Sequence, residues 1–236
     1  MGTLRIVSNS SRVFNSRMEA GDLLAHQLEN VEIRESKFQI PLVVLGVPRG
    51  GIVVAREIAH ALQADLDMVL AHKLGAPGNP ELAIGAVCED GKLFLDEEIS
   101  SYMGVDDDYI KREKSRQLQE IARRVKRYRS VLPKIPLAGR VAIVTDDGVA
   151  TGATLQAALW AVRQENPKKI VAALPVGPQE TLEKLSRDAD ETICLQAPPF
   201  FSAISQFYSY FNQVEDEEPL EILQEESKRR GEQVKG

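Results

Sequence analysis

The sequence predicts an α/β fold in which helices cover both faces of a parallel, doubly wound sheet. Short apolar runs alternate with segments of helical apolar spacing along most of the chain. Such alternation is typical of strand–helix–strand units whose strands are parallel and buried. Neither a clear linker nor an internal repeat interrupts the pattern, so we expect residues 1–236 to form a single domain.

The first part of the chain supplies two predicted strand–helix units. Residues 18–28 and 52–62 place their apolar side chains at helical spacing. The apolar run 42–45 predicts a buried strand, and residues 66–71 predict a second strand. Residues 75–80 are rich in Gly, Pro and Asn, which indicates a mobile loop.

The middle of the chain predicts a pair of strands and a helical insertion. Residues 82–87 and 92–95 are expected to pair across a short turn. Residues 106–132 predict a long helix that starts at an Asp cap and ends at Pro133. The apolar stripe of this helix comprises Ile110, Leu118, Ile121, Val125, Tyr128 and Leu132.

The last third of the chain returns to the alternating pattern. The predicted order is strand 141–144, helix 155–163, strand 170–174, helix 179–186 and strand 192–195. A charged segment without apolar spacing follows after about residue 215, and we expect it to be a mobile tail.

Composition excludes several classes of protein. A net charge of −6 argues against general affinity for nucleic acid. No apolar run approaches the roughly 20 residues that a membrane span needs, and residues 1–10 lack the apolar core of a signal peptide. Cys88 and Cys194 lie in apolar stretches without metal-ligand spacing, which favours packing roles and a reduced, cytoplasmic setting. We also expect a homodimer or a higher homo-oligomer.

The most specific motif lies at residues 141–155, where a buried strand ends in two carboxylates and a loop of small and hydroxyl residues. In an open α/β sheet, ligands bind beyond the carboxyl ends of the strands. A small-residue loop that enters a helix presents N–H groups to an anion. Asp146 and Asp147 can accept from sugar hydroxyls or bind Mg²⁺, directly or through water. A buried strand that ends in an Asp-capped turn is the structural alternative.

This motif resembles the phosphoribosyl pyrophosphate (PRPP) signature of the type I phosphoribosyltransferases, and the resemblance extends over residues 14–223. It implies that Asp146 and Asp147 hold the ribose hydroxyls, and that a small hood covers the acceptor. The loop that it assigns to the 5-phosphate consists of Ala150, Thr151, Gly152, Ala153 and Thr154.

A second glycine loop precedes the first predicted crossover helix at residues 46–51. Gly50 and Gly51 allow close approach of the backbone to a ligand. Their N–H groups can form an anion nest, and Arg49 adds a charge suited to phosphate. A plain turn explains such a loop equally well by itself. The resemblance assigns Arg49, Gly50 and Gly51 to the pyrophosphate of PRPP.

His72 and Lys73 are expected at the end of the second predicted strand, with Lys73 projecting into the same crevice. The resemblance gives Lys73 a contact with the pyrophosphate, which makes it a candidate catalytic residue beside the two aspartates. Relatives often carry Arg where this chain has His72, and we assign His72 no role as a base. A satisfied histidine at a strand end explains it equally well.

The region after Lys73 resembles the closing loop of the family. Residues 75–86 would then exclude water while the sugar reacts. Glu81, the only ionisable group of this loop, either contacts ligand or caps the next element. A departure from relatives occurs at residues 15–17, where they carry an Asp before the Arg.

Two further features have more than one interpretation. The aromatic run between residues 200 and 211 either packs on the core or a dimer partner, or stacks on a planar base. The basic residues at 111–129 form a solvated face over a buried apolar stripe, a subunit contact, or a nucleic-acid surface, in that order of preference.

The favoured function is transfer of 5-phosphoribosyl from PRPP to a nitrogen acceptor, such as a nucleobase, with release of pyrophosphate and with Mg²⁺ as cofactor. The alternative is a regulator that binds PRPP or a nucleotide without catalysis. A P-loop NTPase is excluded because no Gly-Lys-Ser/Thr follows either glycine loop. The sequence leaves purine, pyrimidine and non-nucleobase amine acceptors open.

Overall fold

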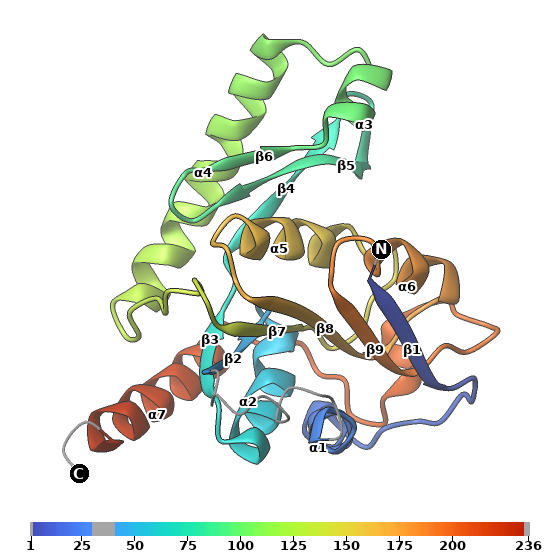
Figure 1. Cartoon of the computed structure of the whole chain (residues 1–236), viewed down its shortest axis with the longest axis vertical. Coiled ribbons are helices and arrows are strands. Elements are labelled where there is room, and N and C mark those ends of the chain that lie inside the picture. Colours follow the sequence, from blue (N-terminus) through green and yellow to red (C-terminus); the bar gives the residue numbers. More distant parts are fainter. Residues whose placement is uncertain (1, 30–40, 234–236) are drawn as a thin grey trace.

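The main body of the protein is a six-stranded parallel sheet with the order β1-β9-β8-β7-β2-β3 (Figure 1). The computed structural model describes residues 2–29 and 41–233. The strands are β1 (Thr3–Ser8), β2 (Leu42–Gly46), β3 (Asp65–Met68), β7 (Val141–Thr145), β8 (Lys169–Val176) and β9 (Glu191–Gln196). The predicted parallel sheet is confirmed.

Helices cover both faces of this sheet. On one face lie α1 (Arg17–Glu29) and α2 (Gly50–Leu62), and on the other lie α5 (Ala153–Arg163) and α6 (Gln179–Leu185) (Figure 1). Adjacent strand residues therefore pack into different cores: Val44 belongs to the α1/α2 side and Val43 to the α5/α6 side. Burial on both sides explains why the strands are continuous apolar runs rather than alternating ones.

A second, antiparallel sheet follows β3 in the chain. It consists of β4 (Ala71–Ala76), β5 (Asn79–Cys88) and β6 (Leu93–Leu95). The strand predicted at 66–71 is thus divided between β3 and β4, so His72 and Lys73 lie within β4 and not at the end of a main-sheet strand. An apolar run crosses this division without interruption, and apolar periodicity therefore gave no sign of the change of sheet.

The segment predicted as a mobile loop at 75–80 is the tip of a hairpin formed by β4 and β5. Leu74 and Ala76 are buried on one side of the tip, and Gly78 takes up a positive φ of 74° in the turn. Gly supplies the backbone conformation that this turn needs. Gly, Pro and Asn are frequent both in mobile loops and in hairpin turns, so composition alone did not distinguish the two.

The second sheet packs across α5 and thereby fixes the helix that follows the predicted phosphate loop. Ala83 and Ala86 of β5 contact a cluster with Ala153, Ala157 and Trp160 of α5. The opposite face of α5 packs on the main sheet through residues such as Leu155 and Leu159. Small side chains on both elements permit the close approach. As a result α5 lies between two sheets.

The predicted helical insertion is α4 (Asp107–Arg129), which follows the short α3 (Glu97–Tyr102). The Asp106 side chain accepts from the Tyr109 N–H at 2.6 Å and caps the helix, as expected. Ile110, Leu118, Ile121 and Val125 pack on the second sheet, whereas Tyr128 and Leu132 are buried in the main core. The helix ends at Arg129, so Leu132 of the predicted stripe lies beyond it.

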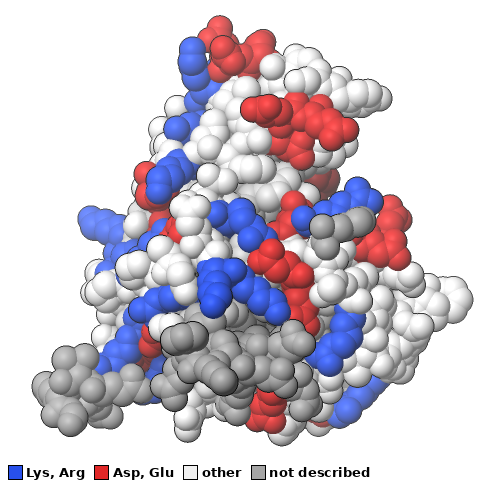
Figure 2. Space-filling model, in the orientation of Figure 1, with Lys and Arg blue, Asp and Glu red and all other residues white. Residues whose placement is uncertain are grey.

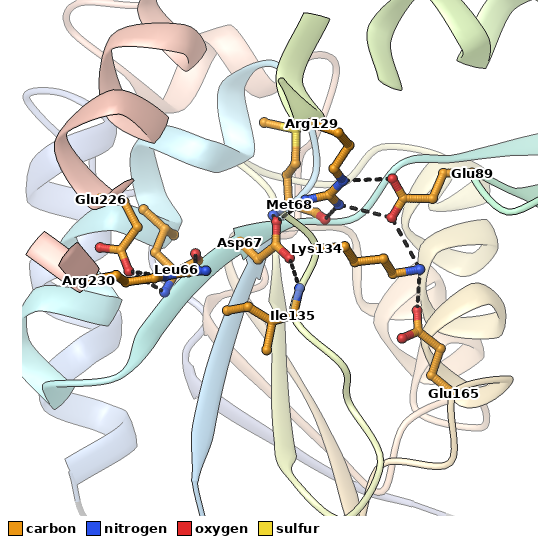
Figure 3. Close-up of polar contacts among 10 residues, drawn as sticks. All are labelled: Leu66, Asp67, Met68, Glu89, Arg129, Lys134, Ile135, Glu165, Glu226 and Arg230. Carbon is orange, nitrogen blue, oxygen red and sulfur yellow. Dashed lines mark hydrogen bonds and ion pairs between the residues drawn. The ribbon is translucent and has the colours of Figure 1, made fainter. Parts of the chain in front are cut away.

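Buried ion pairs hold the C-terminal end of α4 against the main sheet (Figure 3). Arg129 binds the carboxylate of Asp67 at 2.5 Å and that of Glu89 at 2.7 Å. Lys134 bridges Glu89 to Glu165 at the end of α5, at 3.1 and 2.8 Å. The network joins β3, the β5–β6 turn, α4 and α5.

The chain after residue 215 differs from the expected tail. Residues 217–233 form α7 (Glu217–Gln233), whose Ile222 and Leu223 are buried in the core that α2 shares. The buried Glu226 accepts from Arg229. It also accepts from Arg230, which in turn donates to the Leu66 carbonyl (Figure 3). We did not predict this helix, because its buried stripe is narrow and contains only a few apolar side chains.

Candidate active site

Two aspartates follow β7 at the carboxyl edge of the main sheet, as predicted. The Asp147 N–H donates to Asp146 Oδ1 at 2.8 Å, so the two residues form one tight turn. Burial, followed by the neighbouring Asp147 charge, raises the pKa of Asp146 well above its usual range. Burial also raises the pKa of Asp147, although Arg17 opposes the shift. Two buried acids side by side favour a cation or sugar hydroxyls as a third partner.

Arg17 at the start of α1 is the existing partner of this pair. Its Nε donates to Asp147 Oδ2 at 2.7 Å, and its Nη1 donates to the Asn212 carbonyl at 3.0 Å. Its guanidinium lies over the Phe211 ring, 4.0 Å from the centroid. We did not predict this ion pair. The only sequence signal was that residues 15–17 depart from relatives.

Part of the aromatic run packs beside the aspartate pair. Phe207 and Tyr208 are buried in the main core, and the Tyr208 hydroxyl donates to the Asp147 carbonyl at 2.6 Å. Tyr208 stacks on Phe211, with ring centroids 5.0 Å apart, and contacts Phe14 at 5.4 Å. Packing on the core therefore explains Phe207 and Tyr208, whereas Phe211 also faces a cavity.

The predicted phosphate loop lies at the start of α5. Gly152 adopts a positive φ of 78°, and a Cβ at this position would lie 2.7 Å from Thr181 Cγ2. The Thr181 hydroxyl donates to the Ala150 carbonyl at 2.8 Å, which connects the loop to α6. Gly152 has no side chain to cap α5, so the first N–H groups of the helix can bind an anion. Thr151 and Thr154 are exposed beside them.

The glycine loop between β2 and α2 packs directly on the aspartate pair. A Cβ on Gly50 would lie 2.0 Å from Asp147 Oδ2, and a Cβ on Gly51 would lie 2.8 Å from Asp146 Cα. The approach therefore requires glycine at both positions. The Pro48–Arg49 peptide bond is cis.

The side chain of Arg49 turns toward the start of α7. Its Nη1 lies 3.7 Å from Glu215 Oε2 and 3.6 Å from Asp216 Oδ1. Because the Arg49 side chain is one-third exposed, these long contacts are weak. An anion bound at Gly50 could compete for Arg49.

Two cavities flank the glycine loop. The hood cavity, of about 380 Å³, is lined by Arg17, Arg49, Gly50, Asp147 and residues 211–214. The α4 cavity has a similar volume of about 380 Å³ and lies between the glycine loop, β4, the hairpin tip and α4.

The two cavities are lined by different residues of the predicted site. Lys73 and Thr154 line the α4 cavity, whereas Asp147 and Gly50 line the hood cavity. Lys73 Nζ lies 3.0 Å from Glu81 Oε2 across the hairpin. We predicted Lys73 in the crevice of the aspartates; it lines the α4 cavity beside Thr154 of the predicted phosphate loop, and neither aspartate lines that cavity.

No cluster of three or more His, Cys, Asp or Glu side chains able to hold a metal occurs within residues 2–29 and 41–233. A divalent cation at this site would therefore rely on the Asp146–Asp147 pair together with oxygens of a bound ligand. The raised pKa values of both carboxyls fit such an arrangement, because a cation would offset their burial.

Comparison with known proteins agrees with this geometry. The profile of the phosphoribosyl transferase domain matches residues 22–212. The chain belongs to this family. Within the family, it is 40% identical over 212 residues to a provisionally named phosphoribosyl transferase from Mycobacterium tuberculosis strains CDC 1551 and H37Rv. The match covers 90% of this chain and 46% of the length of that protein, so the chain spans about half of it.

A solved structure resembles this phosphoribosyltransferase-family chain closely. The crystal structure of TT1426 from Thermus thermophilus has 44% sequence identity and a TM-score of 0.82, and the alignment covers 90% of this chain and 98% of that one. The type I phosphoribosyltransferase fold is confirmed. None of the helices in the described ranges has the length and apolar character needed to cross a bilayer.

Proposed function

We propose that this protein transfers a 5-phosphoribosyl group from PRPP to a nitrogen acceptor and releases pyrophosphate. The observation that carries the proposal is the contact of Gly50 and Gly51 with Asp147 and Asp146. It brings a predicted pyrophosphate loop against a predicted ribose-binding pair at one edge of the sheet. Membership of the family supports the same assignment.

In this proposal each loop holds one part of PRPP. Asp146 and Asp147 accept from the ribose hydroxyls, and residues 150–154 donate to the 5-phosphate. Arg49, Gly50 and Gly51 hold the pyrophosphate. Catalysis then comes from positioning and from stabilisation of charge on the leaving group.

Mg²⁺ is the proposed cofactor, held by Asp146 and Asp147 directly or through water. When bound, it would supply charge neutralisation on the pyrophosphate. The protein's own part is to keep both carboxylates in place through the Asp147 N–H, the Tyr208 hydroxyl and Arg17.

A ligand-binding experiment tests the PRPP site. PRPP with Mg²⁺ at about 100 times its dissociation constant should stabilise the fold by roughly 2.7 kcal/mol. The double variant Asp146→Asn, Asp147→Asn should fold, by circular dichroism, and lose this stabilisation. A thermal melt of the wild type that PRPP and Mg²⁺ leave unchanged would refute the proposal.

The alternative function is a regulator that binds PRPP or a nucleotide without catalysis. Lys73 and the hairpin tip favour an enzyme, because a cation near a leaving group contributes most when charge develops there. Lys73→Ala should therefore lower kcat for pyrophosphate release, with an acceptor found by screening bases, more than it weakens PRPP binding. Glu81→Gln removes only the partner of Lys73 and is the matched control. Tight PRPP binding without any acceptor in a broad screen would favour the regulator.

A further inference from the structure

Apart from Lys73, Thr154 and the hairpin tip, the residues that line the α4 cavity have no part in the proposed transfer. Apolar side chains such as Val69 and Ile121 line it, and Pro48 and Tyr109 contribute rings to the lining. Its volume of about 380 Å³ is within the range of small-molecule sites, roughly 300 to 1,000 Å³. The cavity therefore has room for a ligand of about the size of a substituted aromatic ring.

Most polar groups around this cavity already have partners on the protein. Arg116 makes two hydrogen bonds to the Glu113 carboxylate, at 2.6 and 2.9 Å. The Gln117 amide N–H also donates to Glu113, at 2.8 Å. Lys73 pairs with Glu81 at 3.0 Å.

The same network determines the state of His72. Because the Gln117 amide nitrogen faces Glu113, its Oε1 is left to accept from His72 Nδ1, at 2.9 Å. The neutral ring thus carries its proton on Nδ1. Burial is the main cause of the lowered pKa of His72. His72 therefore contributes a neutral ring, and not a cation, to the cavity at neutral pH.

Among the charged side chains that line the cavity in the described part of the chain, Arg124 is the exception. It is half-buried on α4 and lines the cavity, and it forms no hydrogen bond or ion pair with any residue that the structure describes. A guanidinium always carries its charge and matches the geometry of carboxylate and phosphate. An unpaired, partly desolvated cation in a cavity that apolar side chains also line indicates an anionic ligand with an apolar body.

The surrounding surface supports this charge preference. Figure 2 shows Lys and Arg side chains along the edge of the molecule where α4 lies. Lys111, Arg112 and Arg116 line a shallow exposed hollow on this helix. A positive surface raises the local concentration of small anions near the cavity.

We propose that the α4 cavity binds a small anionic molecule with a planar, apolar body, and that Arg124 pairs with its carboxylate or phosphate. Asp146 and Asp147 do not line this cavity, but Lys73 and Thr154 do, so the ligand binds beside the proposed PRPP site. The proposal goes beyond the phosphoribosyl transfer, because the pairing of an anion with Arg124 does not require that PRPP is the substrate.

Calorimetric titration with aromatic carboxylates tests this site. The probes are orotate, nicotinate and benzoate, and their uncharged counterparts uracil, nicotinamide and benzamide. At least one carboxylate should bind the wild-type protein, at least tenfold more tightly than its counterpart. Binding should persist with saturating PRPP and Mg²⁺.

Three variants connect the binding to Arg124. Arg124→Gln should weaken the carboxylate at least tenfold, and Arg124→Lys should restore part of the affinity. Arg123→Gln is the matched control, because Arg123 is exposed on the same helix and does not line the cavity. The carboxylate should bind Arg123→Gln with an affinity within twofold of its affinity for the wild type. The proposal is overturned if no carboxylate of the panel binds, or if folded Arg124→Gln binds as tightly as wild type.

The fate of the probe shows how the site is used. Pyrophosphate release when PRPP and the bound carboxylate are both present would make the ligand the acceptor. Binding without pyrophosphate release would make it a separate ligand of the α4 cavity. Both results require Arg124.

Discussion

Arg17 Nε donates to Asp147 Oδ2 at 2.7 Å, so the N-terminal end of α1 holds one of the two carboxylates at the carboxyl edge of the sheet. The side chains of both residues are nearly buried, with exposed fractions of 11% and 13%. Arg17 also contacts Phe211 and the Asn212 carbonyl. One side chain thus connects α1, the lining of the hood cavity and the proposed ribose site.

Loss of Arg17 should destabilise the protein, because it leaves a buried carboxylate without its partner. We expect Arg17→Met to lower the free energy of unfolding by about 3 kcal/mol. Arg12→Met is the matched control, since Arg12 is 55% exposed and its pair with Glu19 should contribute less than about 1 kcal/mol. Urea unfolding measures both, and equal losses would contradict a special role for the buried pair.

A methyl group at Gly50 should impair PRPP binding. Its Cβ would lie 2.0 Å from Asp147 Oδ2, so either the carboxylate or the glycine loop must move. We expect Gly50→Ala to weaken PRPP with Mg²⁺ at least tenfold in calorimetry, which corresponds to about 1.4 kcal/mol. Gly231→Ala places its Cβ in open space and should leave the affinity unchanged. Unaltered PRPP binding by Gly50→Ala would show that this contact does not shape the site.

The ion pairs that hold the end of α4 against the main sheet should contribute strongly to stability. Arg129 is the partner of the buried Asp67, so Arg129→Met should cost about 3 kcal/mol in urea unfolding. It should also increase hydrogen exchange along residues 107–129. Arg123→Met removes an exposed arginine from the same helix and should change stability by less than about 0.5 kcal/mol. If both variants unfold alike, the network of Figure 3 does not hold α4.

His72 should make the native state less stable at acid pH. Burial, as the largest cause, lowers its pKa in the folded protein, and the Arg124 charge acts in the same direction against Gln117 and Glu120. The folded state therefore binds fewer protons than the unfolded state, whose histidine has a pKa of about 6.5. Stability is lost as pH falls through that value.

A pH series on a variant isolates this contribution. Between pH 7.5 and 5.5, the Tm of wild type should fall more than the Tm of His72→Gln. The comparison is needed because other groups also titrate in this range, and the variant retains all of them. A wild-type Tm that falls less than that of the variant would reverse the predicted sign.

Local sequence determined the order of the main elements and the parallel sheet. Strands such as Val141–Thr145 are short apolar runs because both faces are covered, and that pattern is visible without a structure. The strand–loop–helix segment around Asp146 is contiguous, and its resemblance to the PRPP signature was therefore also readable from the sequence. The roles of these residues toward PRPP and Mg²⁺ stay predictions.

Only the tertiary structure decided what lies across from each of these segments. Sequence periodicity reports which side of an element is apolar, but it does not report which other element covers that side. For this reason the division between β3 and β4, the position of α5 between two sheets and the packed helix α7 came only from the structure. The ion pair of Arg17 with Asp147, 130 residues apart in the chain, depends on folding in the same way.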